Sequence, residues 1–174
     1  DYFRTSEQME SLFSEIPEAI ENTIMVARRC SISLPLQAPS FPKISLPSEY
    51  ASSHEYLQAR VAEGLSDRYG TVSEEVSERA QAELEAVRAV GYSDYFLITA
   101  DFVAFARRSG IPVGPGRGAS PGFLINYALG ITDIDPLAYG LLSQRFLNPE
   151  RIANPAIGID FCFEHKKEVA AYIR

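Results

Sequence analysis

The segment 110–122 constrains the fold more than any other part of the sequence. It holds five glycines and three prolines in thirteen residues. Proline has no backbone N–H and breaks a helix interior, while glycine allows turns and a close approach of the main chain. We therefore expect an irregular turn here that separates the apolar residues on its two sides into different elements.

The flanks of this turn predict an arrangement of strand, turn and helix. Residues 111–113 form a short strand candidate, and residues 123–129 run apolar into a helix that Gly130 ends. Such an arrangement aims free backbone N–H groups at an anion, and Arg117 adds a charged fork of donors. We expect residues 113–122 to bind a phosphate of a nucleotide or nucleic acid; a plain glycine turn is the alternative.

The residues of the turn exclude one common class of phosphate-binding loop and weaken the case for another. No Gly-Lys-Ser/Thr follows it, so it is not a Walker A loop. Gly114, Gly116 and Ala119 satisfy the spacing G-x-G-x-x-A of dinucleotide-binding folds. Two prolines interrupt that match, and the acids about 20 residues further on lie in a Thr-Asp-Ile-Asp-Pro turn. A dinucleotide fold is the weaker hypothesis.

The first ninety residues predict a helical lead-in segment. Thr5 to Gln8 fits a capping box, and Pro17 stands where a second helix begins. Residues 31–48 carry four prolines and predict an extended connector. A helix over 49–66 and a second capping box at Thr71 to Glu74 follow, and this box leads a long helix that Gly91 ends.

Two further elements are expected beyond Gly91. Ser93 or Asp94 caps a helix over 95–109 that is apolar nearly all round, which predicts a central, buried position. Residues 155–163 alternate between apolar and small or polar side chains, which predicts a strand with Asp160 on one face. A strand that brings a carboxylate toward a phosphate turn suits Mg²⁺, but one carboxylate is a poor metal site.

The charge of the chain is distributed unevenly. The net charge is −7, and residues 1–90 carry all of it, with 15 acidic and 8 basic side chains. Between Asp101 and Asp133 there is no acid, while Arg107, Arg108 and Arg117 lie there. A locally positive site on an acidic body suits an anionic ligand, with a chance gap among exposed charges as the alternative.

Other features exclude several classes of protein. No apolar run is long enough for a membrane helix, and the start lacks a Met and a signal-peptide pattern, so we expect a cytoplasmic piece of a longer protein. Cys30 and Cys162 are expected to be buried thiols of a reducing compartment. His54 and His165 show no metal-ligand spacing.

Four ordered segments resemble the alpha subunits of bacterial DNA polymerase III. They are YFLI at 95–98, VGPGRG at 113–118, YALGITDIDPL at 127–137 and RFLNPER at 145–151. A looser likeness continues through the helical first half. The resemblance implies an α/β (α+β) fold, in which a helical part over 1–90 precedes the first portion of a polymerase-beta-like nucleotidyltransferase palm over 91–174, a small sheet with helices.

The resemblance also implies a function and a set of site residues. The implied reaction of the family is templated addition of a deoxynucleotide to a primer, with Mg²⁺ as the cofactor. The implied partners are a deoxynucleoside triphosphate, primer–template DNA and other replisome subunits, and no membrane is involved. Asp160 matches the second aspartate of the family's metal-binding Asp-x-Asp strand. The positions expected to face the triphosphate are Gly116, Arg117, Gly118, Ala119, Ser120, Arg145 and Arg151.

The chain departs from the family pattern at four of these places. Ala156 and Gly158 stand where the motif has its first two acids, Ala119 replaces a serine, and Phe123 occupies a position that is usually small and polar. We therefore expect Mg²⁺ not to be retained and the chain not to catalyse the reaction. Two origins stay open: a piece of an active polymerase altered at Gly158, and a degenerate paralogue with a binding or assembly role.

Overall fold

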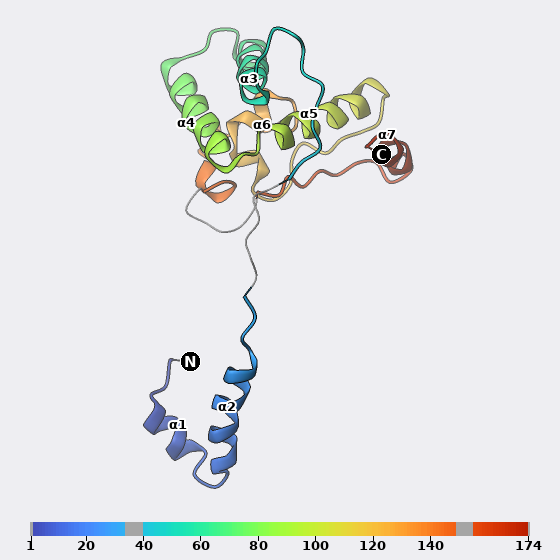
Figure 1. The fold of residues 1–174 in the computed structure, drawn as a ribbon. Helices are drawn as coiled ribbons and strands as arrows, with labels where there is room; N and C mark the ends of the chain where they lie inside the picture. The colour runs from blue at the N-terminus through green and yellow to red at the C-terminus, as the bar shows by residue number, and fades with distance from the viewer. Residues whose placement is uncertain (1, 34–39, 149–154, 174) are drawn as a thin grey trace. The chain divides into compact units, whose positions relative to one another are not determined.

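The computed structural model describes residues 2–33, 40–148 and 155–173 (Figure 1). In these ranges it contains seven α-helices and two short 3₁₀-helices. The chain divides into two compact units, Asp1–Ala38 and Pro39–Arg174. The division falls inside the expected connector 31–48.

The first unit is a pair of helices, α1 (Ser6–Leu12) and α2 (Pro17–Arg29). The predicted capping box is present, because the Thr5 side chain accepts a hydrogen bond from the Gln8 N–H and the Gln8 side chain accepts one from the Thr5 N–H. Pro17 opens α2 as predicted. Neither helix contains a buried residue, and Cys30 after α2 is exposed, so its expected burial was wrong.

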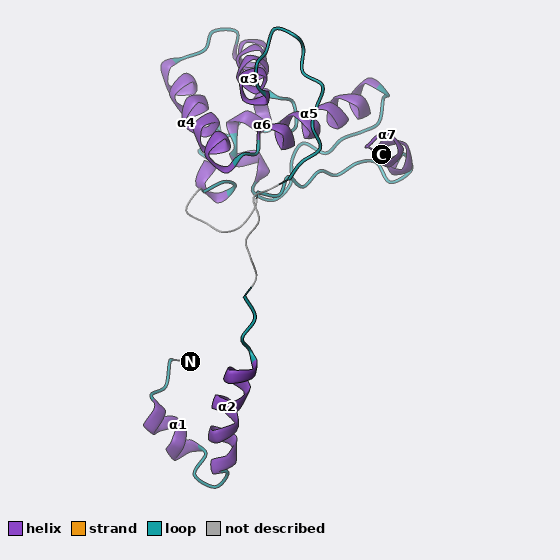
Figure 2. Ribbon diagram, in the orientation of Figure 1, coloured by secondary structure: helices purple, strands orange, loops and turns teal. Residues whose placement is uncertain are grey.

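In the second unit, one long helix contacts two other long helices and a short helix, and one of those two also contacts the short helix (Figure 2). These are α3 (Ser53–Tyr69), α4 (Glu74–Val90), α5 (Ser93–Arg108) and the short α6 (Leu124–Ala128). Apolar side chains from all four form one core; the most deeply buried include Leu57, Val87, Phe96 and Leu124. The helix predicted over 95–109 is buried on one side only: Phe96, Val103 and Ala106 are buried, whereas Asp101 and Arg107 are exposed.

The packing of α3 on α6 depends on the absence of a side chain at Gly64. A Cβ at this position would lie 2.0 Å from the carbonyl oxygen of Ala128, which is backbone and cannot move aside cheaply.

The two ends of α4 are set by residues next to them in the sequence. Gly91 ends α4 in the left-handed conformation as predicted, whereas Ser73 rather than Thr71 caps its start by accepting from the Val76 N–H.

The expected small sheet is not present, which corrects the α/β prediction: the described residues form a helical protein without a strand (Figure 2). The strand candidates 111–113 and 155–163 form one isolated antiparallel bridge, Val113 with Phe161, and Arg117 in the turn forms a second one with Gly158. Pro112 and Pro115 lack the N–H groups that a continuous ladder would need. Burial after Pro155 does not follow the predicted alternation: Ile157, Gly158 and Ile159 are all partly buried, and Phe163 is 76% exposed.

A second, smaller apolar cluster joins the end of the chain to α5. Val169 on α7 (Lys166–Ile173) packs with Ala106 and Ile111, and Phe161 lies against them. The Tyr172 ring stacks on Phe105 with the ring centroids 3.9 Å apart. None of the helices in the described ranges is long and apolar enough to cross a membrane.

Candidate functional site

The glycine turn is held in place by backbone hydrogen bonds to the segment around Asp160. The Gly114 N–H donates to the Asp160 carbonyl at 2.8 Å, and the Cys162 N–H donates to the Pro112 carbonyl at 3.0 Å. On the other side of the turn, the Asp133 N–H donates to the Pro115 carbonyl at 2.7 Å. The turn is therefore fixed between two segments that follow it by about 20 and 45 residues.

Two glycines are required by the path of the turn. Gly116 has φ +152°, and a Cβ there would lie 2.6 Å from the Pro121 ring; Gly118 has φ +63°. L-residues rarely adopt such angles. The many glycines predicted to shape the turn therefore have a conformational reason at these two positions.

Arg117, Asp160 and Gly158 lie together, as the family motif implies. Arg117 Nη1 donates to Asp160 Oδ1 at 3.1 Å, and the two side chains are 68% and 60% exposed. A Cβ on Gly158 would meet the Arg117 side-chain carbons at 3.4–3.7 Å. The aliphatic part of Arg117 thus lies against the residue that has no carboxylate, and its guanidinium pairs with the residue that has one.

A small cavity of about 100 Å³ opens beside the turn. Gly118, Ala119 and Gly122 line one side, and Leu142 and Arg145 line the other. Arg145 is exposed and belongs to the 3₁₀-helix η2 (Ser143–Arg145). The structure therefore brings Arg145 to the turn, while Arg151 lies outside the described residues.

The Ser120 side chain stabilises the turn by a hydrogen bond within it. It is fully buried in the 3₁₀-helix η1 (Ser120–Gly122), and its hydroxyl donates to the Arg117 carbonyl at 2.7 Å. Its own carbonyl accepts from the Asn126 side-chain amide at 2.9 Å. A phosphate contact by Ser120 would therefore have to come from its backbone, and that contact stays a prediction.

A buried carboxylate that the sequence reasoning missed occupies the start of α6. Glu83 on α4 is 2% exposed, and its Oε2 accepts from the Ile125 N–H at 3.1 Å. Its Oε1 accepts from Arg79 Nε at 2.6 Å. The Ile125 N–H, one of the groups expected to face an anion at this helix, is thus already hydrogen-bonded to Glu83.

Arg79 extends this connection to both walls of the small cavity. Its Nη2 donates to the carbonyl of Gly122 at 3.0 Å and to that of Leu141 at 3.1 Å. Burial raises the pKa of Glu83 to about 7, although the hydrogen bonds from Arg79 and Ile125 act to lower it. The pair from α4 therefore fixes the end of the turn and the segment before Arg145.

The sequence pattern around Glu83 indicates that this carboxylate is buried. It follows Ala80 by three residues and precedes Val87 by four, so helical periodicity places it on the apolar face of α4. A carboxylate on a buried face requires a partner, and Arg79 stands one helical turn before it. What periodicity does not reveal is that Glu83 reaches the backbone of α6.

The positive character expected around the turn is partly neutralised inside the fold. Asp133 pairs with Arg68 at 3.0 Å and with Arg107 at 2.8 Å. Burial raises the pKa of Asp133, but the hydrogen bonds from Arg107 and Arg68 outweigh it and hold the pKa below its ordinary value. Asp135 accepts from the Tyr69 hydroxyl at 2.8 Å and from the Leu137 N–H at 2.9 Å, so both acids have structural partners.

Phe123 belongs to the core and not to the surface of the site. It is 1% exposed and stacks on Phe96 with ring centroids 5.7 Å apart; the Phe146 ring lies 4.9 Å away. An aromatic ring at this position thus anchors the segment between the turn and α6. Compared with the family pattern, the site lacks a small polar side chain at this position, and the buried Phe123 ring instead holds the segment in place.

The donor set near the turn does not fit a pair of divalent cations. Two-metal catalysis needs several carboxylates within reach of two ions about 4 Å apart. Asp160 is the single acid in the segment 155–163, and its partner position is Gly158. Within the described ranges, no three His, Cys, Asp or Glu side chains come together in a metal-binding group.

Comparison with known proteins agrees with the motifs. The family model described as the bacterial DNA polymerase III alpha NTPase domain matches residues 55–174. The chain is 46% identical over 173 residues to DNA polymerase III subunit alpha of Treponema pallidum and 44% identical over 173 residues to that of Borreliella burgdorferi. It is 39% identical over 182 residues to the subunit of Escherichia coli K12.

These alignments cover 99% of the chain but only 15–16% of the relatives' length. The range matched by the family model begins two residues inside α3 and includes α4 to α7, the glycine turn and the segment with Asp160. The chain therefore belongs to the bacterial DNA polymerase III alpha family.

Proposed function

We propose that this protein binds the triphosphate of a deoxynucleotide at the glycine turn, as the first palm segment of a DNA polymerase III alpha-type protein. The observation that supports this most directly is the cavity that Gly118, Ala119 and Arg145 line together. Arg117, the residue before Gly118, does not line it and pairs with Asp160. Glycine backbone and guanidinium groups are the donors that phosphate oxygens require. Primer–template DNA and other replisome subunits are the further partners that the family suggests.

The Arg117–Asp160 pair permits such binding at low cost. An ion pair between two mostly exposed side chains contributes only about 0–1 kcal/mol. A triphosphate carries several negative charges and can compete with a single carboxylate for the Arg117 guanidinium. Asp160 thus acts as a weak competitor that keeps Arg117 beside the turn when no anion is bound.

We further propose that the chain binds without catalysing nucleotide addition. Asp160 alone does not fit the metal pair that in-line displacement on a phosphate requires. The dinucleotide-fold alternative has no support, since that fold needs a parallel sheet and the described residues contain none.

Calorimetric titration with dATP, at constant ionic strength and with either Mg²⁺ or EDTA, tests the proposal. We expect saturable binding that Mg²⁺ does not tighten, and an affinity loss of about tenfold for Arg145→Gln. Arg88→Gln removes an exposed arginine far from the turn in sequence, on α4, and is the matched control.

Asp160→Asn separates this mechanism from a metal-dependent one. We expect the variant to bind dATP at least as tightly as the parent, because Arg117 loses a competing carboxylate. A metal-dependent site would instead show binding that requires Mg²⁺ and collapses in the variant. That result, or primer extension that Asp160→Asn abolishes, would contradict the proposal.

A further inference from the structure

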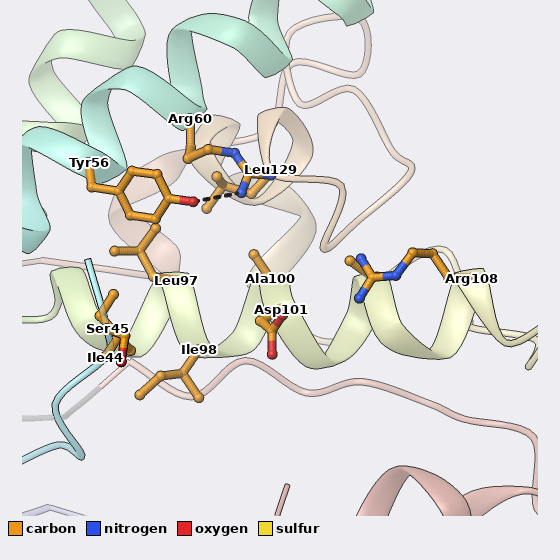
Figure 3. Close-up of a pocket in the computed structure, with 11 residues that line it drawn as sticks. Ile44, Ser45, Tyr56, Arg60, Leu97, Ile98, Ala100, Asp101, Arg108 and Leu129 are labelled. Carbon is orange, nitrogen blue, oxygen red and sulfur yellow. Dashed lines mark hydrogen bonds between the residues drawn. The ribbon is translucent and has the colours of Figure 1, made fainter. Parts of the chain in front are cut away.

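A second cavity, separate from the turn, lies between α3 and α5 (Figure 3). Its volume is about 380 Å³, within the range of roughly 300–1,000 Å³ that is usual for small-molecule sites. It shares no lining residue with the cavity at Gly118 and Arg145. We propose that it binds a small organic anion with an apolar body.

The floor of the cavity is apolar. Leu97 and Ala100 project from α5, Leu129 follows α6, and Ile44 of the segment before α3 closes one end (Figure 3). Leu97 and Ala100 are each 7% exposed and are held in the core cluster. A floor of this kind is preformed, so a ligand that covers it gains hydrophobic free energy without reordering the helices.

Two arginines and one carboxylate line the rim, and a second carboxylate, Glu63, lies against Arg60 outside the lining. Arg60 from α3 and Arg108 from α5 both line the cavity, and Asp101 is its single carboxylate. Figure 3 shows the Arg108 guanidinium turned back along α5 toward Ala100. Within the described ranges no acid forms an ion pair with Arg108, and Asp101 instead accepts a hydrogen bond from the Tyr172 hydroxyl at 2.8 Å.

Arg60 is oriented before any ligand arrives. Its Nη1 donates to the Tyr56 hydroxyl oxygen at 3.3 Å (Figure 3). Its Nε lies 3.3 Å from Glu63 Oε2. The Tyr56 hydroxyl accepts this bond and retains its own hydrogen as a donor. The rim therefore offers a positioned guanidinium, a phenolic donor and a second guanidinium without an acidic partner.

Size and charge together define the ligand class. A free phosphate ion would satisfy the arginines but leave the apolar floor wet, since a volume of 380 Å³ is many times the roughly 30 Å³ that one water takes up in the liquid. A neutral hydrocarbon would cover the floor and leave the guanidiniums unused. A carboxylate or phosphate monoester attached to an aromatic or aliphatic body satisfies both.

Titration of the whole chain with phenyl phosphate, followed by two-dimensional ¹H–¹⁵N NMR, tests the proposal. Inorganic phosphate and benzyl alcohol serve as probes of the charge alone and the ring alone. We expect saturable shifts of the amides of Leu97, Ala100 and Ala104 with phenyl phosphate, and at least fivefold weaker binding of each comparison probe.

Three variants locate the site. Arg108→Gln should weaken phenyl phosphate binding about tenfold, as expected for loss of a charge-assisted hydrogen bond. Ala104→Phe should fill the cavity and abolish binding, with circular dichroism to verify the fold. Arg88→Gln removes the same charge outside the cavity and should leave the affinity unchanged.

The outcomes that overturn the proposal are distinct. They are shifts confined to Gly118 and Ala119, equal affinity for inorganic phosphate, equal weakening by Arg88→Gln, or no saturable shift up to roughly 10 mM probe. Shifts confined to Gly118 and Ala119 would place the anion at the glycine turn and so would agree with the proposed triphosphate site while refuting this one. The other outcomes leave triphosphate binding at the turn to the dATP titration.

Discussion

Replacement of Glu83 by glutamine tests how the buried contact between α4 and α6 contributes to stability. The Glu83 carboxylate is 2% exposed and joins Arg79 to the Ile125 N–H. Glutamine is nearly the same size but has one oxygen in place of two. Either Arg79 or Ile125 therefore faces the glutamine NH₂ group, and a buried donor is left without an acceptor.

The direct cost of this change follows from the unpaired donor. A buried donor without a partner costs about 1–3 kcal/mol, and more where the donor is charged. The same range applies whichever way the glutamine amide is oriented. We expect Glu83→Gln to lower the free energy of unfolding by roughly 2 kcal/mol near pH 7.

The pH dependence gives a sharper test, and its sign follows from the raised pKa. Burial raises the pKa of Glu83 from 4.5 to about 7 in the folded protein. Between these values the folded state binds more protons than the unfolded state, so the free energy of unfolding decreases as pH rises. The stabilising contribution is fully present below about pH 4.5 and is lost as pH rises through about 7, by roughly 3 kcal/mol at about 1.36 kcal/mol per pKa unit.

Other groups that titrate nearby must be separated from this effect. Burial, with help from Arg88, lowers the pKa of His54, so His54 makes the protein more stable as pH rises and opposes Glu83 below about pH 6.5. The lowered pKa of Asp133 acts below about pH 4, outside the window. Both contributions are the same in the parent and in Glu83→Gln, so they cancel in the difference.

Urea unfolding followed by far-ultraviolet circular dichroism, at steps from pH 4.5 to 8, measures this difference. We expect the parent to lose stability relative to Glu83→Gln as pH rises, so the gap between them is largest near pH 5. A gap that is constant, or that widens toward pH 8, would refute the reasoning. It would mean that the bonds from Arg79 and Ile125 outweigh the cost of burying the charge.

Further predictions concern packing and the site. Gly64→Ala places a Cβ 2.0 Å from the Ala128 carbonyl oxygen and should lower the free energy of unfolding by at least about 2 kcal/mol. The control Ala62→Leu, on the exposed side of α3, should change it by under about 0.5 kcal/mol in the same urea experiment. Asp160→Asn should change stability by less than about 1 kcal/mol, because the Arg117–Asp160 pair is mostly exposed. In Gly158→Asp, the new Cβ meets the Arg117 side chain only at ordinary contact distances, so thermal melting should show a folded protein. Calorimetry on this variant should show dATP binding that Mg²⁺ tightens. Binding that Mg²⁺ leaves unchanged would argue against a metal site formed by residues 158 and 160.

The positions of most helices were predictable because their causes are local. Periodic apolar residues, a capping box at Thr5, a proline at the start of α2 and a left-handed glycine at 91 all act within a few residues along the chain. The location of the glycine turn was predictable for the same reason. The likeness to the family singled out Arg117, Gly158 and Asp160, and the structure adds that Arg117 forms a backbone bridge with Gly158 and an ion pair with Asp160.

The expected sheet failed because strand pairing is not a local property. The alternation in 155–163 fits a strand, but its neighbour across the gap contains Pro112 and Pro115, which cannot donate to a ladder. Two bridges form and the pairing then stops. The periodicity of one segment carries no information about the hydrogen-bonding capacity of the segment that it meets.

The amino-acid sequence by itself determined the helices, the turn and the loss of a carboxylate at Gly158. Only the tertiary structure decided which charges and donors remain available at the turn. Asp133 pairs with Arg107, Glu83 accepts from the Ile125 N–H, and Arg145 lines the cavity with Gly118. These partners lie far apart in the chain, Glu83 and Ile125 by 42 residues. Burial gives such contacts their strength, and burial exists only once the helices have packed.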